Sequence, residues 1–199
     1  ALFRNYFYVW KFDDDIGQSS DRMIDNLASI RKMLQSDLFT TEAGFTHATS
    51  EQMKDVNEML DEFPEGRVGQ RLRLGVHSNV QVGDDKEQLI TQVLVSACTW
   101  SGSEDEATEQ EWQRFGQTVE QSSYVGTLAM GVVNHCNNPN RAGSAKVILT
   151  VLPGPDTWVA DAIWMALSLF WDAGLDVVIN LNDKNDCPEL VKLVEDWSK

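Results

Sequence analysis

Three adjacent aspartates, Asp13, Asp14 and Asp15, are the residues of this chain whose chemistry is most easily stated. Carboxylate oxygens hold Mg²⁺ or Ca²⁺ when several of them converge on one ion. Adjacent side chains diverge, however, and the stretch "DDDIGQSSDRMI" has no calcium-loop spacing that ends in a glutamate. The sequence therefore predicts no metal and no cofactor here, and the three carboxylates are interpreted as an acidic loop before a helix, whose N-terminal end favours negative charge.

A second place for chemistry is His135 beside Cys136. A thiol nucleophile needs a base and an oxyanion donor close to it. We expect the chain to be extended over residues 124–133. On a strand, consecutive side chains point to opposite faces, so His135 and Cys136 would not face the same site. One catalytic alternative stays open, a small metal-assisted hydrolase or transferase that uses Asp13, Asp14, Asp15 and His135. The chain contains no GxSxG, HExxH or kinase motif.

The charge of the chain favours binding over catalysis. Its 199 residues include 31 acidic and 16 basic side chains, for a formal net charge of −15. A field of that sign repels phosphate backbones and anionic lipid, so it disfavours direct binding to nucleic acid or to a membrane surface, and it attracts a basic protein partner. A charge that only keeps the protein soluble is the other interpretation. The candidate partner-binding residues are the acids Asp13, Asp14, Asp15, Glu104, Asp105, Glu106, Glu109 and Glu111, with Trp100 and Trp112 as aromatic anchors.

Hydrophobic periodicity in the first two thirds of the chain predicts strands and helices in mixture. Residues 3–12 are aromatic and β-branched, which is typical of a strand. Apolar residues at helical spacing over 23–38 and 53–63 predict two amphipathic helices, the second opened by a capping box of Thr49 and Gln52. Strands are expected over 71–76 and 78–85, and also over 88–100, where a helix is the alternative. A further helix follows over 103–121, with Ser103 and Glu106 as its capping box.

The last third predicts a strand–helix–strand–helix unit. The strands are expected over 146–152 and 175–181, the first helix over 156–173 with Gly174 as its C-cap, and the second helix from Pro188. Such a crossover joins parallel strands. We therefore expect a single α+β domain over residues 1–199, with a mixed sheet and helices packed on it.

The helix over 156–173 carries Trp158, Trp164 and Trp171. We interpret these tryptophans as core residues, but any that stay exposed could anchor a homo-oligomer. The apolar stretch is too short, at under about 20 residues, to predict a membrane span.

The three cysteines, Cys98, Cys136 and Cys187, contain no CxxC pair. They are expected to be buried free thiols in a reducing compartment, the cytoplasm, although one disulfide with a spare thiol is an alternative.

Two stretches of the chain resemble the immunity protein 52 family of polymorphic-toxin systems. These are "NYFYVW" before an amphipathic helix, and "AKVILTVLPGPDTW" with "LSLFWDAGLDVVIN" near the end, in which Leu152–Pro153 and Trp171–Asp172 occupy the family's Leu-Pro and Trp-Asp positions. The arginine expected after the opening tryptophan is absent, since Lys11 and the aspartates stand there. The resemblance covers about a third of the chain. It implies a small α+β protein that neutralises a nuclease toxin and has no catalysis of its own.

Overall fold

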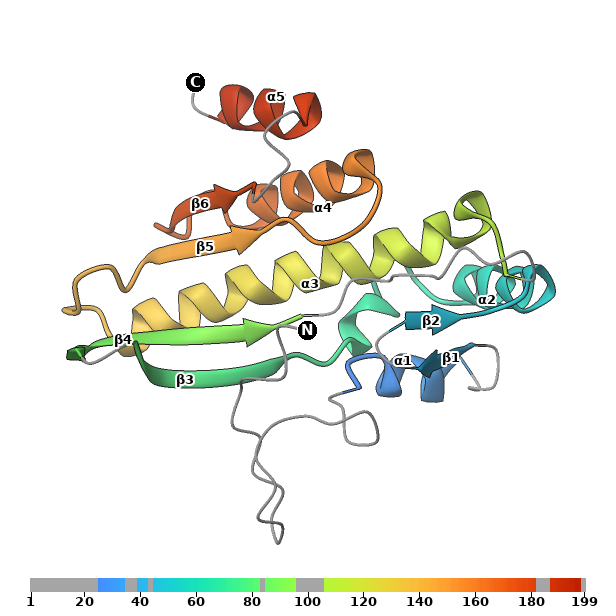
Figure 1. Cartoon of the computed structure of the whole chain (residues 1–199), viewed down its shortest axis with the longest axis horizontal. Coiled ribbons are helices and arrows are strands. Elements are labelled where there is room, and N and C mark those ends of the chain that lie inside the picture. Colours follow the sequence, from blue (N-terminus) through green and yellow to red (C-terminus); the bar gives the residue numbers. More distant parts are fainter. Residues whose placement is uncertain are drawn as a thin grey trace, which may run out of the picture.

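The computed structural model describes residues 25–34, 39–42, 45–82, 85–95, 106–181 and 187–197. The predictions made for residues 3–12, for the three aspartates, and for Cys98, Trp100, Glu104 and Asp105 lie outside these ranges. The described part is α+β, as the sequence predicts (Figure 1). In chain order its elements are α1 (Ala28–Met33), β1 (Thr40–Glu42), β2 (Phe45–His47), α2 (Ser50–Glu62), the 3₁₀ turn η2 (Gly69–Arg71), β3 (Gly75–Val82), β4 (Asp85–Leu94), α3 (Glu109–Asn137), β5 (Lys146–Thr150), α4 (Asp156–Leu169), β6 (Asp176–Asn180) and α5 (Pro188–Trp197).

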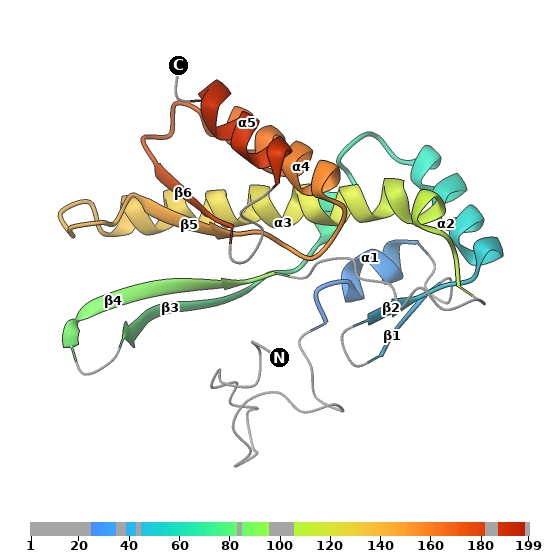
Figure 2. The ribbon, with the colours of Figure 1, turned by 45° about the horizontal axis from the view of Figure 1, so that its top comes forward.

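Helix α3 is the central element, and the other helices and strands lie around it (Figures 1 and 2). The expected extended segment over residues 124–133 is wrong, because α3 continues through it to Asn137. The buried positions keep helical spacing along α3, with members at Trp112, Phe115, Val119, Ser123, Tyr124 and Leu128. Some of these positions hold polar or small residues, so the sequence does not show a continuous apolar stripe. The β-branched residues nearby favour a strand by local propensity alone.

Strands in the described residues form three two-stranded sheets. β1 with β2 and β3 with β4 are antiparallel, whereas β5 and β6 are parallel, with Val147 opposite Val177. The parallel pair confirms the predicted crossover unit. The expected strand over residues 78–85 is wrong as a separate element, because residues 78–82 belong to β3 itself and β4 is the partner.

The buried side chains of the described residues form two groups, which lie toward the two ends of α3. One group of buried side chains joins α1, α2 and the first half of α3, and includes Ile30, Met53 and Phe115. A second group joins the later part of α3 to β5, α4 and α5. Trp158 of α4 reaches back into the first group and lies against Gly116 of α3, where a Cβ would come within 2.7 Å of the Trp158 ring. A glycine is needed there because any side chain would push α4 away from α3.

The hydroxyl of Tyr124 connects α3 to the end of β5. It donates a hydrogen bond to the Thr150 carbonyl (3.1 Å) and accepts one from the Leu152 N–H (3.0 Å). Burial raises the pKa of this hydroxyl above its ordinary value; the hydrogen bond from Leu152 opposes the shift, and the nearby Glu120 adds to it. Both backbone groups would lose this partner if the hydroxyl were removed.

Tyr124→Phe is therefore expected to lower the free energy of unfolding by about 1–3 kcal/mol at neutral pH, because two buried backbone groups lose a partner. A folded-state pKa above the unfolded value means that this contribution is complete below about pH 10 and is lost as pH rises through the folded pKa. Urea unfolding at pH 7 and pH 11 measures both effects. An unchanged midpoint at pH 7 would contradict the assigned hydrogen bonds.

None of the helices in the described ranges combines the length and the apolar character that crossing a bilayer requires.

Candidate functional site

An acidic groove lies between α2 and the first turn of α3. It encloses about 530 Å³. Its lining residues are Ser50, Glu51, Lys54, Asn57, Glu58, Asp61 and Glu111. Four of them are carboxylates and one is a lysine, so the groove is negatively charged and open to a cationic group.

Two capping boxes fix the ends of the helices that form the acidic groove. The Thr49 side chain accepts from the Gln52 N–H at the start of α2, as the sequence predicts. At the start of α3 the cap is Thr108 with Glu111, so the prediction of Ser103 and Glu106 as the capping box is wrong. The sequence does contain the correct motif: "TEQE" has the same capping-box pattern five residues later.

Hydrogen bonds between the two helix ends hold the groove in shape. The Ser50 hydroxyl donates to Glu111 Oε2 (3.0 Å), and Asn57 Nδ2 donates to the Glu111 carbonyl (3.0 Å). The Thr108 N–H, the Thr108 hydroxyl and the Ser50 hydroxyl lower the pKa of the Glu111 carboxyl group, in that order of importance. These hydrogen bonds favour the ionised form of the Glu111 carboxyl group.

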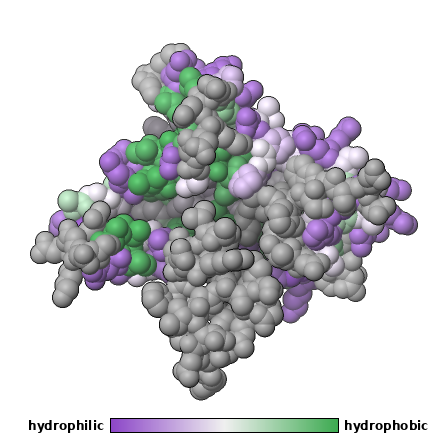
Figure 3. Space-filling view, viewed as in Figure 1, coloured by the Kyte–Doolittle hydropathy of each residue, from purple (hydrophilic) through white to green (hydrophobic). Residues whose placement is uncertain are grey.

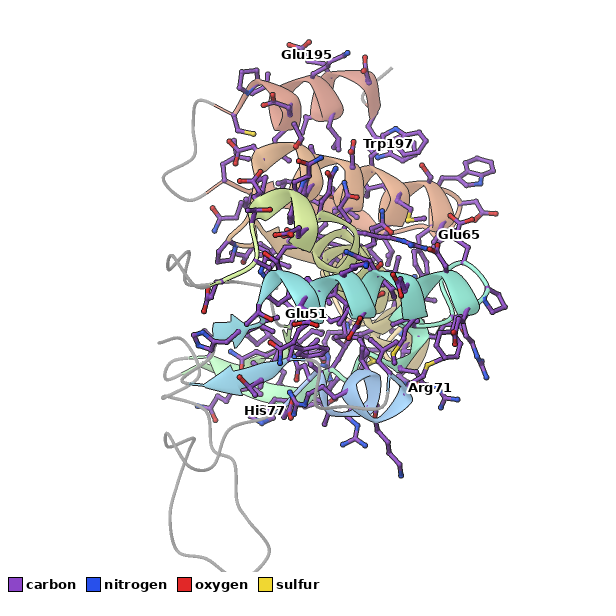
Figure 4. All side chains as sticks on the ribbon, turned by 90° about the vertical axis from the view of Figure 1, so that its right-hand side faces the viewer. Glu51, Glu65, Arg71, His77, Glu195 and Trp197 are labelled. Carbon is purple, nitrogen blue, oxygen red and sulfur yellow. The ribbon has the colours of Figure 1, made fainter. Side chains whose placement is uncertain are left out.

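Not every carboxylate of the groove is equally available to a partner. Asp61 forms an ion pair with Arg114 (2.7 Å), and Glu58 has a long contact with Lys54 (3.8 Å). Both pairs are exposed, and such pairs contribute little and exchange readily with other charges. Glu51 lies at the exposed start of α2 (Figure 4). A cationic partner would meet Glu51 and Glu58 with little competition.

The sequence-predicted contact residues divide into three groups in the structure. Glu111 lines the acidic groove, whereas Glu109 is exposed on the first turn of α3 and is not among the residues that line the groove. Glu106 is nearby in sequence, but its side chain is only 9% exposed and its carboxylate contacts Nδ1 of His47. The remaining predicted acids and Trp100 lie outside the described residues.

The prediction that Trp112 anchors an interface is wrong. Its side chain has no exposed area and packs in the core, with its ring centroid 6.1 Å from that of Phe115. The reason is the helical phase: Trp112 lies on the same side of α3 as Phe115 and Val119, which are both buried.

The acids of α2 are the functional residues that sequence reasoning missed. Glu51, Glu58 and Asp61 lie on the face of α2 opposite the buried Met53, Val56 and Leu60. This arrangement could have been derived from the helical periodicity alone. Their proximity to Glu111 could not, because it depends on how α2 packs against α3.

Of the four residues of the catalytic alternative, only His135 lies in the described part, so this alternative stays a prediction. His135 and Cys136 are both on α3, not on a strand, and His135 Nδ1 is 2.9 Å from the Ser144 hydroxyl. Neither residue lines the acidic groove. Cys136 is exposed and free, which corrects the expected burial, and Cys187 is free and buried as expected.

One cluster away from the groove has residue types that bind metals. Asp156, Cys187 and Glu189 place one ligand atom each within 4.8 Å of one another, at the starts of α4 and α5. Cys187 Sγ is 3.6 Å from Glu189 Oε2. Burial is the main reason why the pKa of the Cys187 thiol is raised, so the protonated thiol is favoured over the thiolate that metals bind.

The tryptophan-rich helix has both buried and exposed members. Trp158 is buried, as expected, whereas Trp164 and Trp171 are 57% and 76% exposed. α4 ends at Leu169, which is four residues earlier than the sequence predicts, so Trp171 lies in the following turn. Self-association through this surface stays a prediction.

If two copies associate there, Trp171→Ser should shift the protein toward monomer because it removes the aromatic side chain that is most exposed among the described residues. Light scattering over a tenfold range of concentration measures the change. A wild-type chain that is monomeric throughout that range would contradict the prediction of a homo-oligomer.

Comparison with known proteins gives no match: no family model, curated protein or solved structure matches this chain.

Proposed function

We propose that this chain is an acidic binding protein without catalytic activity that neutralises a basic protein partner. The most specific form of the proposal is an immunity protein that acts in the cytoplasm and covers the cationic cleft of a nuclease toxin. The acidic groove between α2 and α3 carries the proposal, because it gathers Glu51, Glu58 and Asp61 along α2 beside Glu111 of α3, and hydrogen bonds join the two helices.

The charge pattern suits a nuclease as the partner. A nuclease presents lysine and arginine side chains to hold DNA phosphates. Carboxylates held on a rigid surface can take the place of those phosphates. The net charge of −15 would speed the encounter with such a partner, and close charge pairs inside the contact would slow its release.

The resemblance to the immunity protein 52 family supports the choice of a toxin nuclease among basic partners. It rests on "NYFYVW" and on the Leu152–Pro153 and Trp171–Asp172 positions. Leu152 lies between β5 and α4, and Trp171 lies in the turn after α4. Both therefore belong to the crossover unit and not to the acidic groove. The resemblance thus supports the class of partner, and the groove supports the place of contact.

The test uses the protein that the adjacent gene encodes, purified in the absence of this chain. Plasmid DNA is incubated with that protein and with increasing amounts of this chain. We expect DNA cleavage that falls to zero near one equivalent, together with a 1:1 complex by size-exclusion chromatography. Continued cleavage at a tenfold excess, or no cleavage by the adjacent protein alone, would contradict the proposal.

Calorimetric titration of this chain alone with Mg²⁺, Mn²⁺ and Ca²⁺ separates the proposal from the metal-assisted hydrolase. A binding protein of the proposed kind should show no tight site. A stoichiometric site, accompanied by hydrolysis that is lost in His135→Ala, would favour the enzyme.

A further inference from the structure

The starts of α4 and α5 bring together three side chains of types that bind metals. Asp156 is the first residue of α4, Cys187 directly precedes α5, and Glu189 lies in the first turn of α5. Each offers one ligand atom, and the three atoms lie within 4.8 Å of one another. α5 packs beside α4 (Figures 1 and 2), so the contact between these helices joins residues from two distant parts of the chain.

Two of the three residues have an explanation that needs no metal. The N-terminal end of a helix favours negative charge, and Asp156 and Glu189 both lie in a first turn. Cys187 is different, because its side chain is 2% exposed and its Sγ lies 3.6 Å from Glu189 Oε2. Burial is the main cause that raises the pKa of this thiol, and both carboxylates add to the shift. A buried thiol between two carboxylates therefore gains nothing from them as an ionisable group.

A bound cation would reverse that relation, because it attracts the sulfur and both carboxylates at once. Zinc binds Cys sulfur at about 2.3 Å and carboxylate oxygen at about 2.1 Å, usually in tetrahedral geometry, which separates the two ligand atoms by about 3.6 Å. The observed distance between Cys187 Sγ and Glu189 Oε2 is the same, 3.6 Å. The Asp156 oxygen lies within 4.8 Å of both atoms, so a rotation of its side chain would complete the set.

The surroundings of Cys187 suit an ion that is held firmly. Its side chain belongs to the second group of buried side chains, together with Val159 of α4 and Leu190 of α5. In the space-filling view, apolar residues show among hydrophilic ones over the part of the molecule where α4, β6 and α5 lie (Figure 3). Electrostatic attraction is stronger beside apolar groups than in water. Asp156 is half-buried and Glu189 is exposed, which leaves a way in from solvent.

We propose that Asp156, Cys187 and Glu189 form a site for one divalent cation of the Zn²⁺ type, which joins the start of α4 to the start of α5. Thiolate sulfur selects such ions over Mg²⁺ and Ca²⁺, which prefer oxygen ligands. The ion takes the place of the thiol proton, which passes to solvent, and water holds the fourth position. The site lies outside the acidic groove and does not depend on the proposed function.

Titration of the full chain with Co²⁺ and Zn²⁺ tests the site. The protein is first freed of metal with a chelator and kept reduced with a phosphine. Co²⁺ should produce the near-ultraviolet charge-transfer absorption of a cobalt thiolate, complete at one equivalent, and Zn²⁺ should displace it. A tenfold excess of Mg²⁺ should leave the absorption unchanged. A wild-type chain that shows no such absorption overturns the proposal.

Serine variants identify the thiol. Cys98→Ser combined with Cys136→Ser leaves Cys187 as the only thiol of the chain and should keep the absorption. Cys187→Ser should lose it and should weaken Zn²⁺ binding by at least about 100-fold, because a ligand is removed. An absorption that persists in Cys187→Ser overturns the proposal, since a different thiol then binds the ion.

Glu189→Gln tests a second ligand without disturbing the core, because Glu189 is exposed. It should keep the absorption but weaken Zn²⁺ binding by at least about tenfold in calorimetry. Glu195→Gln is the matched control: it removes the same charge from an exposed position of α5 outside the cluster, and it should bind Zn²⁺ as the wild type does. Equal affinity of Glu189→Gln and the wild type also overturns the proposal.

Discussion

Glu51→Lys combined with Glu58→Lys is expected to weaken binding of the basic partner by about 10- to 100-fold, mainly through slower association. Both side chains line the acidic groove and are exposed, and neither caps a helix with its side chain. Their replacement changes the charge of the groove by four units while leaving the hydrogen bonds of Ser50, Asn57 and Glu111 in place. The salt dependence of the association rate should become flatter, because fewer opposite charges act over the distance of approach. Surface plasmon resonance between 50 and 500 mM salt would measure both quantities.

The matched control is Asp172→Lys with Glu195→Lys. Both residues are exposed, and the pair changes the net charge of the chain by the same four units. Glu195 lies on α5, away from Glu51 (Figure 4). If the affinity depends on the local groove, the control variant should bind nearly as the wild type does. Equal weakening by both variants would show that only the overall charge matters, and the groove would lose its assigned role.

Trp112→Ala is expected to cost about 3–5 kcal/mol of unfolding free energy, a large part of the roughly 5–15 kcal/mol that stabilises a folded domain. The indole has no exposed area and packs where α1, α2 and α3 meet. Its removal leaves a cavity beside Phe115 that the rigid helix ends cannot close. Urea denaturation followed by far-UV circular dichroism would show the lower midpoint.

Trp112→Phe should recover part of this loss, because it keeps an aromatic ring against Phe115 in a smaller volume. The opposite pattern is also informative. If Trp112→Ala unfolds at the wild-type midpoint but binds the partner weakly, Trp112 is the surface anchor that the sequence suggested, and its burial against Phe115 is incorrect.

Local patterns were sufficient for much of the secondary structure. The capping box at Thr49 and Gln52, the stripe of Met53, Val56 and Leu60, and the proline that opens α5 each act within one or two helical turns. The parallel pairing of β5 and β6 could also be predicted, because the length and helical pattern of the connection allow few other arrangements. In contrast, α3 extends beyond its predicted end because its stripe includes Ser123 and Tyr124, whose burial depends on the elements packed around them.

The candidate site depended more heavily on tertiary structure. The sequence by itself determined that the chain is strongly acidic and that it is an α+β protein, because charge and periodicity are properties of the residues and their order. Only the folded chain decided which acids share a surface. It placed Glu51 and Glu58 of α2 beside Glu111 of α3, took Glu106 out of reach by pairing it with His47, and buried Trp112. The physical reason is that the packing of α2 on α3 brings together residues more than 50 positions apart. No local pattern along the chain specifies which of these distant residues will meet.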